Sequence, residues 1–98
     1  MEPQITFTVQ QVVSILRTAS IQLQDARGPR RTQRGGMRVS RWLGSDYPGA
    51  TLVMVSLINL DPLTARGQFD AAKELLAKRG AMIAEPNGPD ALCLVVTN

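Results

Sequence analysis

The chain has 98 residues, of which 44% are hydrophobic and 19% are charged, a composition typical of one folded domain and not of a disordered segment. It contains no histidine and a single cysteine, Cys93, which excludes His-based catalytic triads, His-containing metal sites and an intramolecular disulfide. The longest apolar run, residues 50–60, is shorter than the roughly 20 residues of a transmembrane helix. We therefore expect residues 1–98 to form one cytoplasmic domain without a membrane partner, with its thiol in a reducing compartment.

A first helix is predicted from Thr8 to about Arg27. Thr8 is a candidate N-cap, and Gln11 completes a capping box with it. Apolar residues then recur at helical spacing, namely Val9, Val12, Val13, Leu16, Ala19 and Leu23. Ile21 lies off this apolar face and is expected to contact a neighbouring element or a partner. Gly28-Pro29 is expected to end the helix.

Residues 28–36 lack apolar side chains and include three glycines, so they are predicted to form a flexible loop. Residues 37–43 alternate loosely and predict a strand. A turn composition follows in residues 44–49. Residues 51–60, rich in Val, Leu and Ile, predict the most central strand. Together these segments indicate a β-hairpin with a long connection.

A second helix is predicted to begin at Asp61-Pro62, with Asp as the cap and Pro at the first helical position. Its apolar stripe comprises Phe69, Ala72, Leu75 and Leu76. Gly80 is expected to end the helix in a left-handed conformation. Residues 81–84 and 91–97 then predict two strands joined by a Pro- and Gly-containing turn.

This order predicts an α+β fold with two helices packed on one face of an antiparallel sheet of about four strands, αββαββ. If residues 4–7 form a strand, the order approaches the ferredoxin-like βαββαβ pattern. The last strand, residues 92–97, has few charges, and two interpretations of it stay open: an edge strand, which would invite pairing, or an ordinary strand of the core. We expect a homodimer, with Ile21, Met54 and Met82 contributing apolar contacts.

The positive charge of the chain is concentrated in residues 27–41, here called the arginine segment. This segment contains six of the eleven basic residues and no acid, whereas the rest of the chain has five basic and eight acidic residues. Guanidinium groups make planar, bidentate contacts to carboxylates and phosphates. Trp42 and Tyr47 follow and can stack on a base or on a partner's side chain. The predicted partner-binding residues are Arg27, Arg30, Arg31, Arg34, Arg38, Arg41, Trp42 and Tyr47.

Three interpretations of the arginine segment remain open. The first is a non-enzymatic regulatory protein that docks on an acidic protein surface, and the second is a nucleic-acid-binding protein that uses the same residues. The third is a solvated loop that provides solubility, with Trp42 anchored in the core. The glycines of residues 28–36 lack the Gly-Lys-Ser/Thr of a phosphate-binding loop, and no helix-turn-helix or zinc-finger pattern is present.

The sequence predicts no catalytic residue, cofactor or metal site. Its carboxylates at turns, such as Asp46, Asp61, Glu85 and Asp90, are best explained as caps and turn formers. Cys93 alternates with apolar residues and has no histidine to activate it, so it is interpreted as a buried apolar residue. We therefore expect that the protein is not an enzyme.

In its composition the chain resembles the small accessory proteins of GC-rich actinobacteria and their phages. The resemblance is carried by nine arginines against two lysines, by the alanine content, by the absence of histidine and by the compact helix–strand–strand order. It covers the whole chain, and it assigns no site residue. It implies a small non-catalytic protein that binds a cellular component and alters the behaviour of that component.

Overall fold

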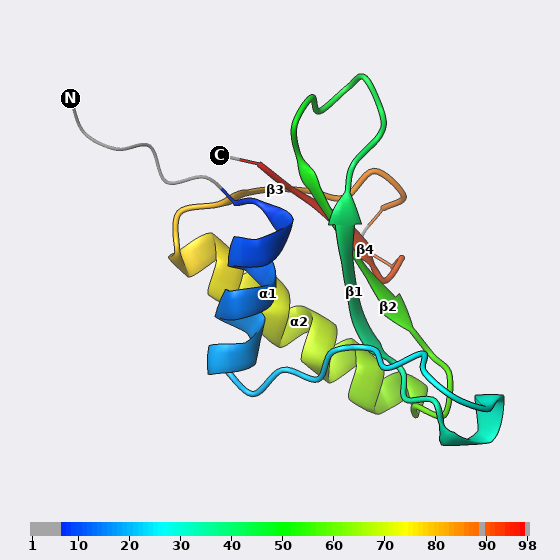
Figure 1. Cartoon of the computed structure of the whole chain (residues 1–98). Coiled ribbons are helices and arrows are strands. Elements are labelled where there is room, and N and C mark those ends of the chain that lie inside the picture. The colour runs from blue at the N-terminus through cyan, green and yellow to red at the C-terminus, as the bar shows by residue number, and fades with distance from the viewer. Residues whose placement is uncertain (1–6, 89, 98) are drawn as a thin grey trace.

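The computed structural model describes residues 7–88 and 90–97. Its elements are α1 (Val9–Thr18), the short 3-10 helix η1 (Arg30–Thr32), β1 (Gly36–Arg41), β2 (Thr51–Ser56), α2 (Pro62–Lys78), β3 (Met82–Ala84) and β4 (Cys93–Thr97). Two helices and a four-stranded antiparallel sheet confirm the predicted α+β fold and the αββαββ order (Figure 1). The strand considered for residues 4–7 falls mostly on residues 1–6, which lie outside the described residues.

Helix α1 begins as predicted but ends much earlier. The Thr8 hydroxyl accepts a hydrogen bond from the Gln11 amide, and the Gln11 side chain accepts one from the Thr8 amide, as in a capping box. The prediction that the helix continues to Arg27 was wrong, because it ends at Thr18 and Ser20 adopts a left-handed φ of 59°. The Thr18 hydroxyl donates to the Ile15 carbonyl, a local bond that competes with continuation of the helix.

The chain after α1 is extended and runs back along the sheet. Ile21 is 8% exposed and belongs to the main apolar core, so it contacts neighbouring elements, the first of its two predicted roles, and its predicted part in a dimer contact was wrong. Leu23 forms an isolated parallel bridge with Met37, and Asp25 forms an antiparallel bridge with Arg34. These residues therefore attach to the N-terminal end of β1 instead of extending the helix.

A pair of glycines permits this close approach. Gly36 has a φ of 151°, and a Cβ atom there would lie 2.6 Å from the Gln22 carbonyl oxygen. A Cβ at Gly35 would lie 2.3 Å from the carbonyl oxygen of Ser56, on the other side of the strand. No side chain larger than hydrogen fits at either position without a shift of backbone. The two glycines, expected in a loop, thus sit where three chain segments meet.

The sheet order is β1-β2-β4-β3, and each pair of neighbours is antiparallel. Of the two interpretations of residues 92–97, the edge strand was wrong and the core strand is confirmed, because β4 lies between β2 and β3. Four consecutive residues of β4 are buried, from Cys93 to Val96, which is the pattern of a central strand. The two edge strands are β1 and the three-residue β3.

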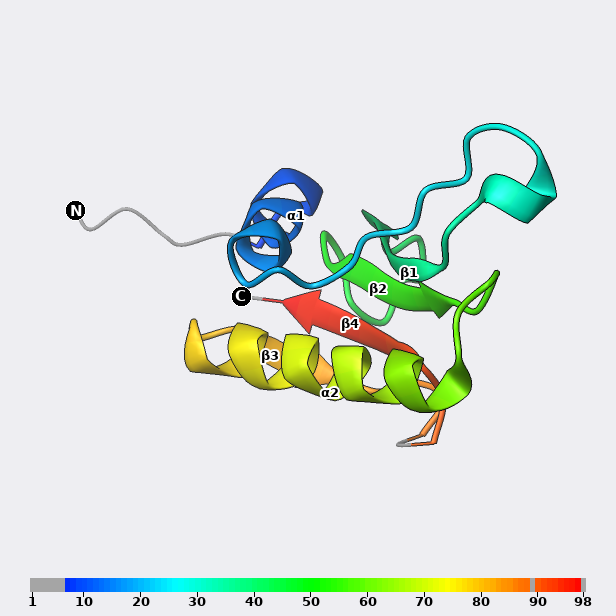
Figure 2. The ribbon, with the colours of Figure 1, turned by 90° about the horizontal axis from the view of Figure 1, so that it is seen from below.

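Both helices pack on the same face of the sheet, and the core lies between the helices and the sheet (Figure 2). Helix α2 has the predicted Asp61 cap, whose carboxylate accepts from the Thr64 amide, and Gly80 follows it with a φ of 95°. Phe69 and Leu76 of α2 are fully buried against Val53 and Leu94 of the central strands. Within the described part of the chain, neither helix is long and apolar enough to cross a membrane.

Candidate partner-binding surface

The arginine segment begins in a protruding loop that is held by hydrogen bonds. Arg30 and Arg31 are exposed in η1, at the tip of this loop (Figure 1). The side-chain amide of Asn59 donates to the carbonyl oxygens of Arg30 and Gln33, at 2.9 and 2.8 Å. Asn59 itself has a left-handed φ of 50°, which Asn tolerates better than most residues. The loop thus presents two guanidinium groups on a backbone tied to the turn that follows β2.

Arg27 is neutralised by an acid that lies just before the arginine segment. Its guanidinium donates to both carboxylate oxygens of Asp25, at 3.0 and 3.1 Å, and its backbone amide also donates to this carboxylate. These hydrogen bonds lower the pKa of Asp25 from 3.8 to about 2, and they raise the pKa of Arg27. Arg27 is therefore the one predicted site residue whose charge is locally compensated among the described residues.

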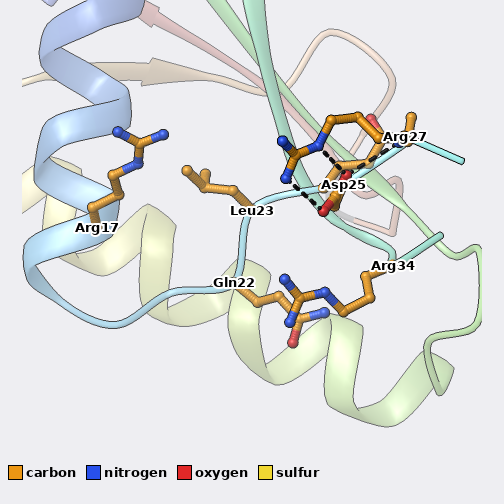
Figure 3. Close-up of a pocket in the computed structure, with 8 residues that line it drawn as sticks. Arg17, Gln22, Leu23, Asp25, Arg27 and Arg34 are labelled. Atoms are coloured by element: carbon orange, nitrogen blue, oxygen red, sulfur yellow. Dashed lines mark hydrogen bonds and ion pairs between the residues drawn. The ribbon is translucent and has the colours of Figure 1, made fainter. Parts of the chain in front are cut away.

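Arg34 and Arg17 line a cavity of about 620 Å³ beside this ion pair. Figure 3 shows Arg17 reaching from α1 toward Leu23, with Arg34 and Gln22 on the other side of the extended segment. Gln22 is fixed by two hydrogen bonds: its backbone N–H donates to the Gln68 side chain, and its side-chain amide donates to the Gly35 carbonyl. Two arginines from distant parts of the sequence thus face one hollow.

This hollow continues along the seam between α1 and β1. A second cavity, of about 290 Å³, shares Arg17 and Leu23 with the first and is lined further by Val13, Arg38 and Val39. Two more cavities follow, sharing Val9 and Gln10 with each other, and the last one includes Arg41. We call this continuous depression the α1–β1 groove; its lining includes Val9, Gln10, Val13, Arg17, Leu23, Arg34, Arg38, Val39 and Arg41.

The charge of the α1–β1 groove is of one sign. Arg17, Arg34, Arg38 and Arg41 all line it, and none of them has an ion-pair partner among the residues that the structure describes. The one acid in the lining is Asp25, which Arg27 already pairs. Half-buried valines and Leu23 lie between the arginines. A ligand of this groove therefore needs acidic groups alongside apolar ones.

The two predicted aromatic residues lie next to the Arg41 end of this groove and away from the arginines of η1. Trp42 and Tyr47 belong to the loop between β1 and β2, at the opposite end of that hairpin from η1 (Figure 1). Their ring centroids are 6.4 Å apart, and the Trp42 indole donates to the Asp46 carboxylate at 2.8 Å. Both rings are half-buried. Trp42 is thus not a core anchor, and its indole N–H is already engaged by Asp46.

Burial, a helix cap and an ion pair account for the other residues that could carry chemistry, namely Cys93, Asp61 and Glu85. Cys93 is 7% exposed in the central strand β4, and burial raises the pKa of its thiol. Asp61 caps α2, and Glu85 pairs with Lys73 of α2. In residues 7–88 and 90–97, no three His, Cys, Asp or Glu side chains lie close enough together to hold a metal ion.

Sequence reasoning missed Arg17, because a helix continuing to Arg27 gives no reason for Arg17 to lie near Arg34. The alternation of Ile21 and Leu23 with Gln22 and Gln24 is a strand-like period that favours an extended segment. It was outweighed by the longer helical periodicity that precedes it. Reading these four residues as extended would have returned the chain to β1 and brought Arg17 and Arg34 together.

Comparison of the chain with protein-family models, with curated proteins and with solved structures finds no match.

Proposed function

We propose that this chain is a small non-enzymatic regulatory protein that binds an acidic surface of another protein through the α1–β1 groove and the adjoining loop that contains Arg30 and Arg31. The observation that carries the proposal is a set of four arginines that line one groove and have no ion-pair partner among the described residues. The one acid among the described lining residues, Asp25, is already paired with Arg27. Arg30 and Arg31 extend the same charge beyond the groove. A regulatory protein acts by occupying such a surface and needs no chemistry of its own.

The groove favours a protein partner over a nucleic acid. Val13, Val39 and Leu23 give it an apolar floor, which suits side chains better than a phosphate backbone. Single-stranded nucleic acids are bound by arginines interleaved with aromatic rings. Here the two rings of Trp42 and Tyr47 adjoin Arg41 alone, at the other end of the hairpin from η1, and the Trp42 indole is hydrogen-bonded to the Asp46 carboxylate. Nucleic-acid binding through the same arginines is the second candidate.

A peptide-display selection on the immobilised chain tests this function. Random twelve-residue peptides are selected for binding and counter-selected against the triple variant Arg17→Glu, Arg38→Glu, Arg41→Glu. We expect enrichment of peptides rich in Asp and Glu that also contain apolar residues. Labelled single- and double-stranded oligonucleotides are titrated in parallel at about 0.15 M salt, where surface charges are substantially screened. Oligonucleotide binding tighter than that of every selected peptide would replace the first candidate by the second.

A matched pair of single variants localises the binding site. Arg38→Glu places an acid in the groove, and Arg79→Glu makes the same charge change at the exposed end of α2. Arg38→Glu removes a charge-assisted contact, and each 1.4 kcal/mol of binding free energy lost weakens the affinity about tenfold. We expect a tenfold or larger loss for Arg38→Glu and less than twofold for Arg79→Glu. Equal losses would mean that net charge, and not the groove, governs binding.

We also propose that two copies associate through the outer face of the sheet, opposite the helices. The strand register places Leu52 and Ala84 on either side of Val95 on this face. Met54 and Met82, which are 40% and 66% exposed, belong to the same face. Burial of these apolar side chains against a second copy is favourable. Met54→Glu with Met82→Glu is expected to shift the sedimenting species from dimer to monomer, and a wild-type monomer at high micromolar concentration would refute the dimer.

A further inference from the structure

The backbone of β1 is open along part of its outer edge. At Met37 this edge is occupied, because the Met37 amide donates to the Gln22 carbonyl at 2.9 Å and the Met37 carbonyl accepts from the Gln24 amide at 3.0 Å. Backbone groups of successive residues in a strand point alternately to the two sides. The outward direction of Met37 therefore fixes the direction of its neighbours in the same strand.

By this alternation, the N–H and C=O groups of Val39 and Arg41 also point away from β2. The pairing of Trp42 confirms the phase, since its amide donates inward to the Ala50 carbonyl at 3.0 Å. No other strand or extended segment in the described part of the chain pairs with Val39 or Arg41 from outside. Two donors and two acceptors thus form an unpaired strand edge, and such an edge is a template for pairing with another strand.

This open edge borders the α1–β1 groove. On one side of it Val13 and Arg17 project from α1, and the half-buried side chain of Val39 faces the same side, toward the core. Arg38 alternates with Val39 and is exposed. A strand laid beside Val39 would therefore meet Val13 and Val39, together with Arg17 and Arg41, on the face toward α1, and the Arg38 guanidinium on the other face.

We propose that the partner binds as an extended segment that adds a fifth strand to the sheet beside Val39–Arg41, with alternating apolar and acidic side chains. Its main chain pairs with the open groups of Val39 and Arg41, its apolar side chains lie toward Val13, and its acidic side chains lie toward Arg38. This inference rests on the proposed function and specifies how the acidic partner is recognised. The pattern is that of strand addition, in which the backbone supplies affinity and alternate side chains supply specificity.

Charge complementarity selects β1 over the other edge of the sheet. β3 has three residues, and Glu85 follows it directly. The β1 edge is flanked by Arg17, Arg38 and Arg41. Charge complementarity therefore favours the β1 edge for an acidic segment. The bridge between Leu23 and Met37 shows that an extended segment already pairs with this edge of β1.

The test uses a capped decapeptide in which Glu and Val alternate, together with two forms of it that are N-methylated either on every Val or on every Glu. Backbone amides whose N–H faces β1 belong to the Val residues in an antiparallel arrangement and to the Glu residues in a parallel one. We expect one methylated form to bind at least tenfold more weakly than the parent peptide and the other to stay within threefold. The identity of the sensitive form gives the strand direction.

Amide hydrogen exchange measured by NMR provides the second readout. We expect the Val39 and Arg41 amides to exchange at least tenfold more slowly with the parent peptide bound, and those of the β3 edge to be unchanged. Peptide binding that depends on Arg38, with neither methylated form impaired and no protection at Val39 and Arg41, overturns strand addition and leaves the proposed function standing. Failure of the display selection to enrich acidic peptides overturns both.

A second copy of this chain is the other occupant that the experiment detects. Protection of Val39 and Arg41 without peptide, increasing with protein concentration, would show that two β1 edges pair with each other. That result overturns the proposal of an acidic partner strand.

Discussion

The two halves of the molecule share one plan and differ in what surrounds their helices. Each consists of a helix followed by an antiparallel pair of strands, and the halves join where β2 pairs with β4. Helix α2 is 17 residues long and its surface contains ion pairs between Arg66 and Asp70 and between Lys78 and Glu74. Helix α1 is 10 residues long, and the groove beside it contains cations without such partners among the described residues.

The two halves also differ in the balance of their charges. The second half contains four basic and five acidic residues, and its charges neutralise one another, whereas the first 60 residues contain seven arginines and three acids. Like charges held close together on a surface repel and stabilise nothing. We propose that a ligand of opposite charge accounts for this arrangement. The comparison therefore predicts different responses when equivalent changes are made in the two halves.

The largest effect is expected in the core beneath α2. Phe69 is fully buried, and Phe69→Ala should lower the free energy of unfolding by about 3–5 kcal/mol. Since small domains have only about 5–15 kcal/mol of total stability, much of that stability would be lost. Urea unfolding followed by circular dichroism measures the change. Leu63→Ala on the exposed side of α2 is the control, because Leu63 is 84% exposed and its replacement should have little effect.

A glycine in each half provides a pair of substitutions with opposite sign. Gly36→Ala forces a Cβ atom against the Gln22 carbonyl at a φ of 151°, so it should destabilise the fold by about 2 kcal/mol or more. Gly67→Ala lies within α2, where a Cβ meets no atom within 4 Å, and it should stabilise by about 0.5–1 kcal/mol.

Thermal unfolding of both glycine variants measures these shifts. Gly36→Ala should also release residues 22–25 from β1, which would appear as faster amide exchange at Gln24 and Asp25. Stability unchanged in Gly36→Ala would mean that the extended segment does not depend on its close approach to the strand. The groove, which this segment closes at one end, would then need another explanation.

The charged residues of the two halves should differ in their contribution to stability. Lys73 and Glu85 are 39% and 20% exposed, and Glu85→Gln should destabilise the fold by about 1 kcal/mol because it removes a partly buried partner. Arg38→Gln removes an unpaired charge and should change stability by less than about 0.5 kcal/mol. The same urea series measures both. A loss for Arg38→Gln as large as that for Glu85→Gln would assign Arg38 a structural role instead of a binding role.

The second half could be predicted from the sequence better than the first. Asp61, Pro62 and Gly80 delimit α2 by local rules that no distant contact overrides. The end of α1 depends on pairing between residues 22–25 and β1, a long-range contact that outweighs the helical periodicity of the preceding residues. The sequence likewise left residues 92–97 open between an edge strand and a core strand, because low charge fits both, and pairing with β2 and β3 decides for the core.

The candidate site was likewise predictable in part. Clustering of arginines in the sequence identified Arg34, Arg38 and Arg41, which the groove brings together. It could not identify Arg17, which joins them through the fold alone. Nor could it show that Arg27 is paired, since Asp25 lies just outside the arginine segment. Proximity in sequence is thus informative about charge and uninformative about which charges are compensated.

The smallest expected effect concerns the one compensated arginine in the first half. The pKa of Asp25 is about 2 in the folded chain against an ordinary 3.8, because Arg27 donates hydrogen bonds to its carboxylate. A carboxylate with a lowered folded-state pKa stabilises the fold above its unfolded-state pKa and loses that contribution as the pH falls through the folded-state value. The contribution should therefore be complete above about pH 5 and disappear toward pH 2.

Asp25→Asn should remove this pH dependence while leaving the rest of the acid transition in place, which thermal unfolding at pH 6 and at pH 2 would show. Because the pair is exposed to solvent, high salt should reduce the difference between wild type and variant at pH 6. An identical acid response in the two proteins would mean that Asp25 and Arg27 are not paired in solution, and Arg27 would then join the unpaired arginines of the groove.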